Sequence, residues 1–124
     1  MGDGGTARAQ LGQRAEEAVA RYLEAAGVSI VARNLRLGRL ELDIVARRAE
    51  LVLVVEVRTR GVGAWTSGLG SLSRAKRERI RRAGQRLWRD RYKSDPTVER
   101  LRFDAASVRF DGTRADIDYV VAAF

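Results

Sequence analysis

The segment LELDIVARRAELVLVVEVRTR, residues 40–60, decides the fold of this chain. Residues 40–46 and 51–58 are rich in aliphatic and β-branched side chains, and the polar stretch 47–50 between them is typical of a turn. The pattern therefore predicts a β-hairpin whose loop is residues 47–50. Residues 51–58 are apolar at both parities, which predicts a central strand that is covered on both faces by helices.

Acidic residues gather on one face of this hairpin. A loop over residues 47–50 sets Glu56 opposite Glu41, and Asp43 opposite Val54. Residues that are directly opposed or two apart share a face, so these acids and the neighbouring Arg58 project together. Carboxylates on one face of a buried strand pair repel one another and are costly to desolvate. Either an ion-pair lattice with nearby arginines or a divalent cation must neutralise them.

Helical patterns lie on both sides of the hairpin. Gly27 ends the first apolar stripe, and Glu16 lies on the border of that stripe. The second helix is expected over about residues 74–93, with Ser71 or Ser73 as its N-cap. The first stripe consists of Leu11, Ala15, Ala18, Val19, Tyr22, Leu23 and Ala26, and the second of Ile80, Ala83, Gly84, Leu87 and Trp88.

The remaining patterns predict one domain. Residues 28–31 with 34–37, and later 101–110 and 115–121, read as strands. We expect residues 1–9 to be a flexible N-terminus and residues 10–124 to form a single domain. The order α-β-β-β-α-β-β predicts an α/β or α+β fold, with a central mixed β-sheet flanked by helices.

Composition limits the chemistry. The 124 residues include 24 Lys and Arg against 16 Asp and Glu, a formal net charge of +8, and no Cys or His. Thiolate and imidazole sites are therefore excluded, and any metal must be held by oxygen, which favours Mg²⁺ or Mn²⁺. No apolar run is long enough for a membrane span or a secretion signal, so a cytoplasmic protein without a membrane partner is expected.

The basic residues are candidate contacts to nucleic acid, since arginine binds phosphate in a bidentate way. A GC-rich genome would also raise the arginine content with no functional meaning. Lys76 lies on the apolar sector of the second helix and could contact a phosphate or extend to solvent. The candidate contacts are Arg60, Arg74, Arg77, Arg81, Lys76 and, in the Gly-rich stretch 61–73, Trp65.

Several short motifs, in order, match a known family. Asp43 followed by Glu56-Val57-Arg58 on the next strand is similar to the D…(D/E)-x-K signature of the PD-(D/E)xK nuclease superfamily. From about Leu11 onward the chain resembles the YraN family of small bacterial proteins. Its patterns G-E-x-x-A-x-x-Y-L, R-N…G-E-I-D-L-I-A, V-E-V-K-x-R, S-x-x-K and R-F-D are echoed by residues 15–23, 33–34 with 40–46, 55–60, 73–76 and 102–104.

The resemblance implies a restriction-endonuclease-like fold, similar to archaeal Holliday junction resolvases. It implies a Mg²⁺ or Mn²⁺ site held by Asp43 and Glu56, with Glu16 as a further acid and Glu41 beside the site. The implied activity is that of an endonuclease, a hydrolase acting on structured or branched DNA in repair or recombination. The partner would be nucleic acid, most readily DNA, and a homodimer is a further expectation.

Some positions depart from the family pattern. The usual Lys is Arg58, which can neutralise a phosphate but is a poor base. Leu40 and Ala15 replace glycines, and Tyr119 and Ala122 stand where His and Asn are usual. These departures leave three readings open: a metal-dependent endonuclease, a DNA-binding module of the same fold with weak or no catalysis, and a protein-interaction domain.

Overall fold

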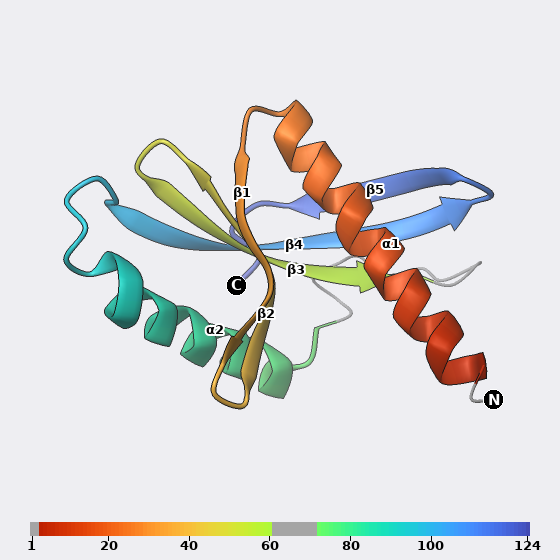
Figure 1. Cartoon of the computed structure of the whole chain (residues 1–124), viewed down its shortest axis with the longest axis horizontal. Helices are drawn as coiled ribbons and strands as arrows, with labels where there is room; N and C mark the ends of the chain where they lie inside the picture. The colour runs from red at the N-terminus through yellow and green to blue at the C-terminus, as the bar shows by residue number, and fades with distance from the viewer. Residues whose placement is uncertain (1–2, 61–71) are drawn as a thin grey trace.

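A twisted five-stranded sheet organises residues 3–60 and 72–124, the part of the chain that this computed structural model describes (Figure 1). The strands lie in the order β1-β2-β3-β4-β5, and only β3 and β4 are parallel. The predicted single α+β domain with a mixed sheet is confirmed. The elements are α1 (Asp3–Ala25), β1 (Ser29–Leu37), β2 (Leu40–Arg48), β3 (Leu51–Thr59), α2 (Arg74–Leu87), the π-helical η1 (Trp88–Tyr92), β4 (Arg100–Asp111) and β5 (Arg114–Val120).

Each face of the sheet carries one helix (Figure 1). Val19 of α1 packs in a cluster with Val55 of β3, whereas Ile80 of α2 packs in a cluster with Val54. Successive β3 residues thus enter different cores, as the alternation of a strand requires. The prediction that this strand is central and covered on both faces is confirmed. Parallel pairing of β3 with β4 needs a crossover, to which α2 and η1 belong.

The first helix is longer than its apolar stripe predicts. It begins at Asp3, so the residues of 3–9, expected to be loose, are helical. This stretch contains no Pro, and its Ala and Arg residues favour a helix. Leu11 and Tyr22, both predicted to belong to the apolar stripe, are exposed, and Tyr22 stacks on Tyr119 with ring centroids 5.5 Å apart.

The hairpin between β2 and β3 is tighter than predicted. Arg48 pairs with Leu51, and Val45 rather than Asp43 pairs with Val54, so the turn is Ala49-Glu50 and not residues 47–50. Ala49 adopts a left-handed φ of 53°, which a tight hairpin turn demands. The register differs from the predicted one by two residues, and an even shift leaves side chains on the same face. The predicted cross-strand pairs were wrong, and the predicted face of Glu41, Asp43, Glu56 and Arg58 lies beyond the last paired residues, Ile44 and Val55.

Asp104 anchors the C-terminal end of the sheet. Its side chain is 0% exposed and accepts hydrogen bonds from Arg102 Nε (2.9 Å), Arg102 Nη2 (3.0 Å), Tyr119 Oη (2.6 Å) and Ala122 N (2.8 Å). Burial and the bond to Asp104 raise the pKa of Tyr119, which keeps the phenol a donor. Tyr119 and Ala122, which stand where His and Asn are usual in the family pattern, thus both donate a hydrogen bond to Asp104.

Replacement of a glycine by alanine should change the stability in opposite directions at two helical positions. A Cβ at Gly84 in α2 would lie 2.5 Å from Phe103 Cζ, whereas at Gly12 in α1 it would meet nothing within 4 Å. Gly84→Ala should lower the free energy of unfolding by about 1 kcal/mol, since overpacking exceeds the gain in helix propensity. Gly12→Ala should raise it by roughly 0.5–1 kcal/mol. Urea denaturation measures both, and a stabilised Gly84→Ala would contradict the close packing.

Candidate metal and nucleic-acid site

The acid pair lies where β2 and β3 diverge. The paired register of the two strands ends at Ile44 and Val55. One residue further, the Asp43 carboxylate replaces a backbone acceptor, because Val57 N donates to Asp43 Oδ2 at 2.9 Å. The Asp43 side chain therefore bridges to β3 beside Glu56.

Lys76 reaches the acid pair from α2, the helix that packs on one face of the sheet. Lys76 Nζ lies 3.0 Å from Glu56 Oε1, and the Glu56 side chain is only 4% exposed. Ser73, one of the two predicted N-caps, caps α2, because its Oγ accepts from Lys76 N at 3.1 Å, and this contact fixes the first turn over the sheet. Burial and the adjacent Asp43 carboxylate raise the pKa of Glu56 to about 8, against the smaller lowering by Lys76. At neutral pH Glu56 therefore retains a proton, which a divalent cation bound at the acid pair would displace.

Two clefts of about 280 Å³ each meet at Asp43, Glu56 and Lys76. One opens between the β1–β2 hairpin and α2, and the other opens toward α1. The first is completed by Arg39, Leu40, Glu41, Arg79 and Ile80, and the second by Gly12, Ala15, Glu16, Val57, Arg58 and Thr59. All the acids that the sequence singled out, together with Arg58, therefore border one continuous site.

Glu16 enters the site from α1. Its Oε1 accepts a hydrogen bond from Asn34 Nδ2 of β1 at 3.1 Å. Burial raises the pKa of Glu16, while the bond from Asn34 opposes this and the Asp43 charge adds to it. The placement on the border of the apolar stripe is what directs this carboxylate toward the edge of the core.

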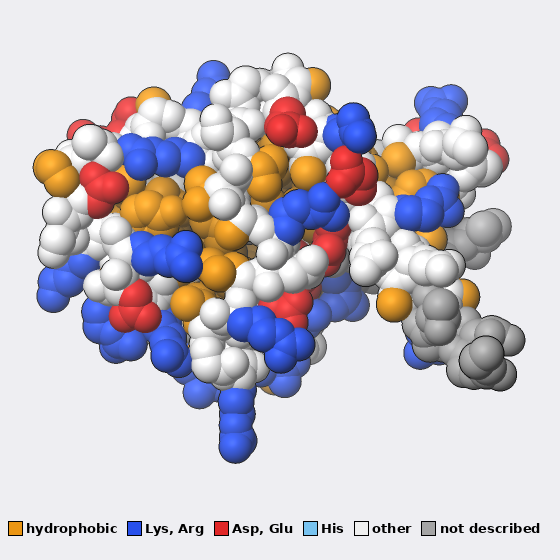
Figure 2. Space-filling view, viewed as in Figure 1, with side chains coloured by type: hydrophobic (Ala, Val, Ile, Leu, Met, Phe, Trp, Pro, Cys, Tyr) orange, Lys and Arg blue, Asp and Glu red, His pale blue; other side chains and the backbone are white. Residues whose placement is uncertain are grey.

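The basic residues form a separate surface along α2. Arg74, Arg77 and Arg81 line a cleft of about 380 Å³ with Glu78, and Arg74 Nε lies 3.7 Å from Glu78 Oε1. Lys and Arg side chains gather on the lower left of Figure 2, where Figure 1 places α2. Arg60 follows β3 and does not line the acidic clefts in the described ranges, and Trp65 lies outside the described residues.

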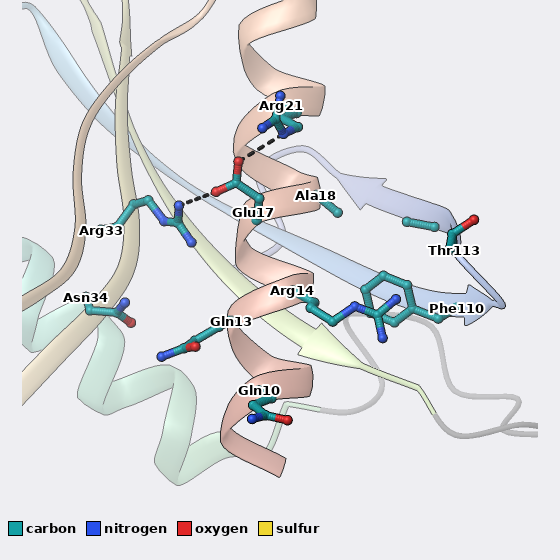
Figure 3. A pocket seen from close by; sticks show the side chains of 11 residues that line it. Gln10, Gln13, Arg14, Glu17, Ala18, Arg21, Arg33, Asn34, Phe110 and Thr113 are labelled. Carbon is teal, nitrogen blue, oxygen red and sulfur yellow. Dashed lines mark hydrogen bonds and ion pairs between the residues drawn. The ribbon is translucent and has the colours of Figure 1, made fainter. Parts of the chain in front are cut away.

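A larger cleft, about 780 Å³, lies along the exposed side of α1 and does not include the acid pair (Figure 3). Glu17 pairs there with Arg21 (2.9 Å) and with Arg33 (2.6 Å), and the Arg14 guanidinium lies 4.3 Å from the centre of the Phe110 ring. These arginines already have partners within the chain, so the acidic clefts are the stronger candidate for chemistry.

The donor set suits one kind of metal site. Within residues 3–60 and 72–124, no three acidic side chains converge closely enough to hold a metal ion by themselves. Asp43 and Glu56 supply two carboxylates once Glu56 releases its proton. Mg²⁺ usually takes one or two carboxylates and completes its shell with water and phosphate oxygens. The residues fit such an open site and not a closed protein cage.

Comparison with known proteins places this site in a family. The family described as "Uncharacterised protein family UPF0102" matches residues 15–108, which include every residue of the acid pair and its neighbours Glu16 and Lys76. The chain belongs to the UPF0102 family. This is the YraN family of the resemblance, within the restriction-endonuclease-like superfamily, so that prediction is confirmed.

Similar UPF0102 proteins occur in several bacteria. The chain is 52% identical over 119 residues to UPF0102 protein sce2912 of Sorangium cellulosum, covering 95% of this chain and 83% of that protein. A UPF0102 protein of Nocardia farcinica is 42% identical over 92% of this chain and 88% of its own length. One of Myxococcus xanthus is 38% identical over 94% and 90%. These names state family membership and no activity.

Sequence reasoning missed three parts of the UPF0102 site. The ion pair of Lys76 with Glu56 and the presence of Arg79 in the cleft depend on where α2 crosses the sheet. The signal for Lys76 was its position one turn before Ile80 on the buried stripe, which pointed inward without naming a partner. Asn34 carried no signal beyond its place in the R-N motif.

The raised pKa of Glu56 predicts a pH-dependent stability for this UPF0102 chain. The folded state retains a proton up to about pH 8, whereas an exposed Glu loses it near 4.5, so stability falls as pH rises through that window. The loss between pH 5 and pH 8 should be about 3–4 kcal/mol with EDTA present. Glu56→Gln should remove most of this slope and make the protein more stable than wild type at pH 8.

Urea denaturation at several pH values checks this expectation. The chain contains no His, so few other groups titrate between pH 5 and pH 8. Glu24→Gln on the exposed surface of α1 is the matched control and should keep the wild-type slope. Equal slopes for wild type and Glu56→Gln would contradict the raised pKa.

No helix among the residues described here is long and apolar enough to cross a membrane.

Proposed function

We propose that this UPF0102 protein binds structured or branched DNA and hydrolyses its phosphodiester bonds, with Mg²⁺ or Mn²⁺ held by Asp43 and Glu56. The observation that carries the proposal is the buried Glu56 carboxylate beside Asp43, in a cleft that a phosphate can enter from two sides. A buried pair of carboxylates is costly unless a cation joins it, and perturbed acids of this kind are concentrated at functional sites.

The residues around the acid pair have complementary roles in hydrolysis. A bound divalent cation supplies Lewis-acid activation of the phosphodiester and of the attacking water. The ammonium of Lys76 and the guanidinium of Arg58 stabilise the negative charge that develops on the phosphoryl oxygens. Glu16, whose pKa is raised, can accept the proton that the attacking water releases.

Lys76 changes the meaning of the departure at Arg58. The strand position that carries Lys in the superfamily signature holds Arg58, yet α2 delivers an ammonium to the same cleft. A lysine and an arginine therefore both border the acid pair. The Lys-to-Arg change consequently does not deprive the site of an amine.

The arginines of α2 would bind the DNA backbone outside the cleavage site. Arg77→Ala with Arg81→Ala should weaken binding to a DNA junction and should reduce the slope of log K against log salt by about 1–2 units. Fluorescence anisotropy measures the affinity and its salt slope. The titrations cover roughly 50 to 300 mM NaCl, where counterion release dominates the salt dependence.

The matched control for this prediction removes two arginines elsewhere. Arg48 and Arg100 are exposed and flank Leu51, at the other end of β3 from Glu56. Arg48→Ala with Arg100→Ala makes the same change in net charge, and its salt slope should stay closer to wild type. Equal losses for the two double variants would show that net charge, and not the α2 cleft, governs binding.

A second candidate function is DNA binding without cleavage. It is favoured by the ion pair itself, since Lys76 already supplies part of the charge that a cation would bring to Glu56. Incubation of the purified protein with a four-way junction and a linear duplex, in Mg²⁺, Mn²⁺ or EDTA, separates the candidates. Metal-dependent cleavage supports the first, salt-sensitive binding without cleavage supports the second, and no binding in low salt contradicts both.

A further inference from the structure

Asn34 has an unusual backbone in the middle of β1. Its φ is +50°, in the left-handed region, although it is not a glycine and lies within a strand. Asn tolerates this region better than most residues, but strain of this kind persists mainly where surrounding structure over-determines it, often at functional sites. A contact of the Asn34 side chain is therefore expected to offset the cost of this backbone conformation.

The left-handed residue turns two adjacent side chains toward one helix. In a regular strand neighbouring side chains point to opposite faces. Here Arg33 Nη1 lies 2.6 Å from Glu17 Oε2, and Asn34 Nδ2 lies 3.1 Å from Glu16 Oε1. Figure 3 shows Arg33 and Asn34 both directed from β1 toward α1. Two consecutive β1 residues thus hold two consecutive acids of α1.

The same residue lies in line with the acid pair. Arg33 pairs with Ile44 and Leu35 with Leu42, so the register sets Asn34 across from Asp43. Glu16, which Asn34 holds, borders the same cleft as Asp43 and Glu56. Asn34 is therefore placed beside the candidate metal site without itself lining either acidic cleft in the described chain.

We infer that Asn34 is a positioning residue, which holds the Glu16 carboxylate at the cleft so that Glu16 contributes to divalent-cation binding there through a water of the cation and not as a third direct ligand. The inference rests on the proposed function. The amide donates to one carboxylate oxygen and leaves the other available to a ligand or its water. Other side chains would fail for separate reasons: Ala lacks the donor and resists a positive φ, Gly lacks the donor, and Asp would repel Glu16.

Calorimetric titration with Mn²⁺ tests the inference on four full-length proteins: wild type, Asn34→Gly, Glu16→Gln and the double variant. Asn34→Gly accepts the left-handed backbone, so its thermal midpoint should stay close to wild type. Its Mn²⁺ affinity should fall by about 10-fold, the usual scale for removing a partner of a ligand. The double variant should bind Mn²⁺ like Glu16→Gln alone, because Asn34 acts only through Glu16.

The matched control is Arg33→Gln, which removes the neighbouring contact to Glu17 and should bind Mn²⁺ within about twofold of wild type. Additive losses in the double variant, or wild-type affinity in Asn34→Gly, would overturn the positioning role while leaving the acid pair as a metal site. Wild-type protein that binds no Mn²⁺ would overturn the metal site and this role together.

Discussion

Asp43→Asn is expected to lower Mn²⁺-dependent cleavage of a DNA junction by about 10³-fold or more, which corresponds to several kcal/mol of lost metal assistance. The substitution removes one of the two carboxylates of the acid pair. Asn keeps an oxygen that can accept from Val57 N, so the strand contact and the fold should survive. Single-turnover cleavage, with the circular dichroism spectrum as a check on folding, measures the effect.

DNA binding separates loss of chemistry from loss of substrate. Asp43→Asn removes a negative charge beside the phosphate path, so its affinity for the junction in EDTA should equal or exceed that of wild type. Glu24→Gln, on the exposed surface of α1, should retain wild-type cleavage. Cleavage that persists in both Asp43→Asn and Glu56→Gln would refute the proposed site, and a parallel fall in junction binding would point to misfolding.

Asp104→Ala is expected to lower the free energy of unfolding by about 3–5 kcal/mol, the usual effect of breaking a buried ion pair. The variant would leave Arg102, the Tyr119 hydroxyl and the Ala122 amide without the acceptor they share. Each orphaned donor then bears a desolvation cost. Urea denaturation at neutral pH measures the loss, and a thermal midpoint lower by more than 10 °C or so should accompany it.

Asp116 offers the matched control. It also pairs with two arginines, Arg109 at 3.7 Å and Arg114 at 3.2 Å, but its side chain is 36% exposed. Asp116→Ala should therefore cost no more than about 1 kcal/mol, and less in high salt. Similar losses for Asp104→Ala and Asp116→Ala would mean that burial does not set the strength of these pairs.

Patterns local to one strand or helix carried most of the fold. Apolar residues at both parities of residues 51–58 predicted a strand with two covered faces, and the parity of Asp43 and Glu56 survived a wrong turn length because the register error was even. The N-cap at Ser73 followed from one side chain and its neighbours. Such features depend on interactions within a few residues, which a sequence displays directly.

Contacts between a helix and the sheet could not be predicted from patterns within one strand or helix. Whether Lys76 meets Glu56 depends on the crossing of α2 over β3, and no local periodicity encodes that angle. The bond from Asn34 to Glu16 depends on a left-handed backbone inside a strand. Asn is compatible with that conformation, but it is equally common in ordinary turns.

The irregularity of β1 also protects the sheet from growing. β1 and β5 are the two edge strands, and an edge of regular backbone groups is a template for association with another chain. The register of β1 shifts between Ile30 and Ala32, and Asn34 interrupts it again, so its outer edge is a poor template. At the other edge, charged residues including Asp116 and Asp118 oppose pairing. A side chain at position 34 that favours a regular strand would therefore lower resistance to aggregation, whereas Gly would preserve it.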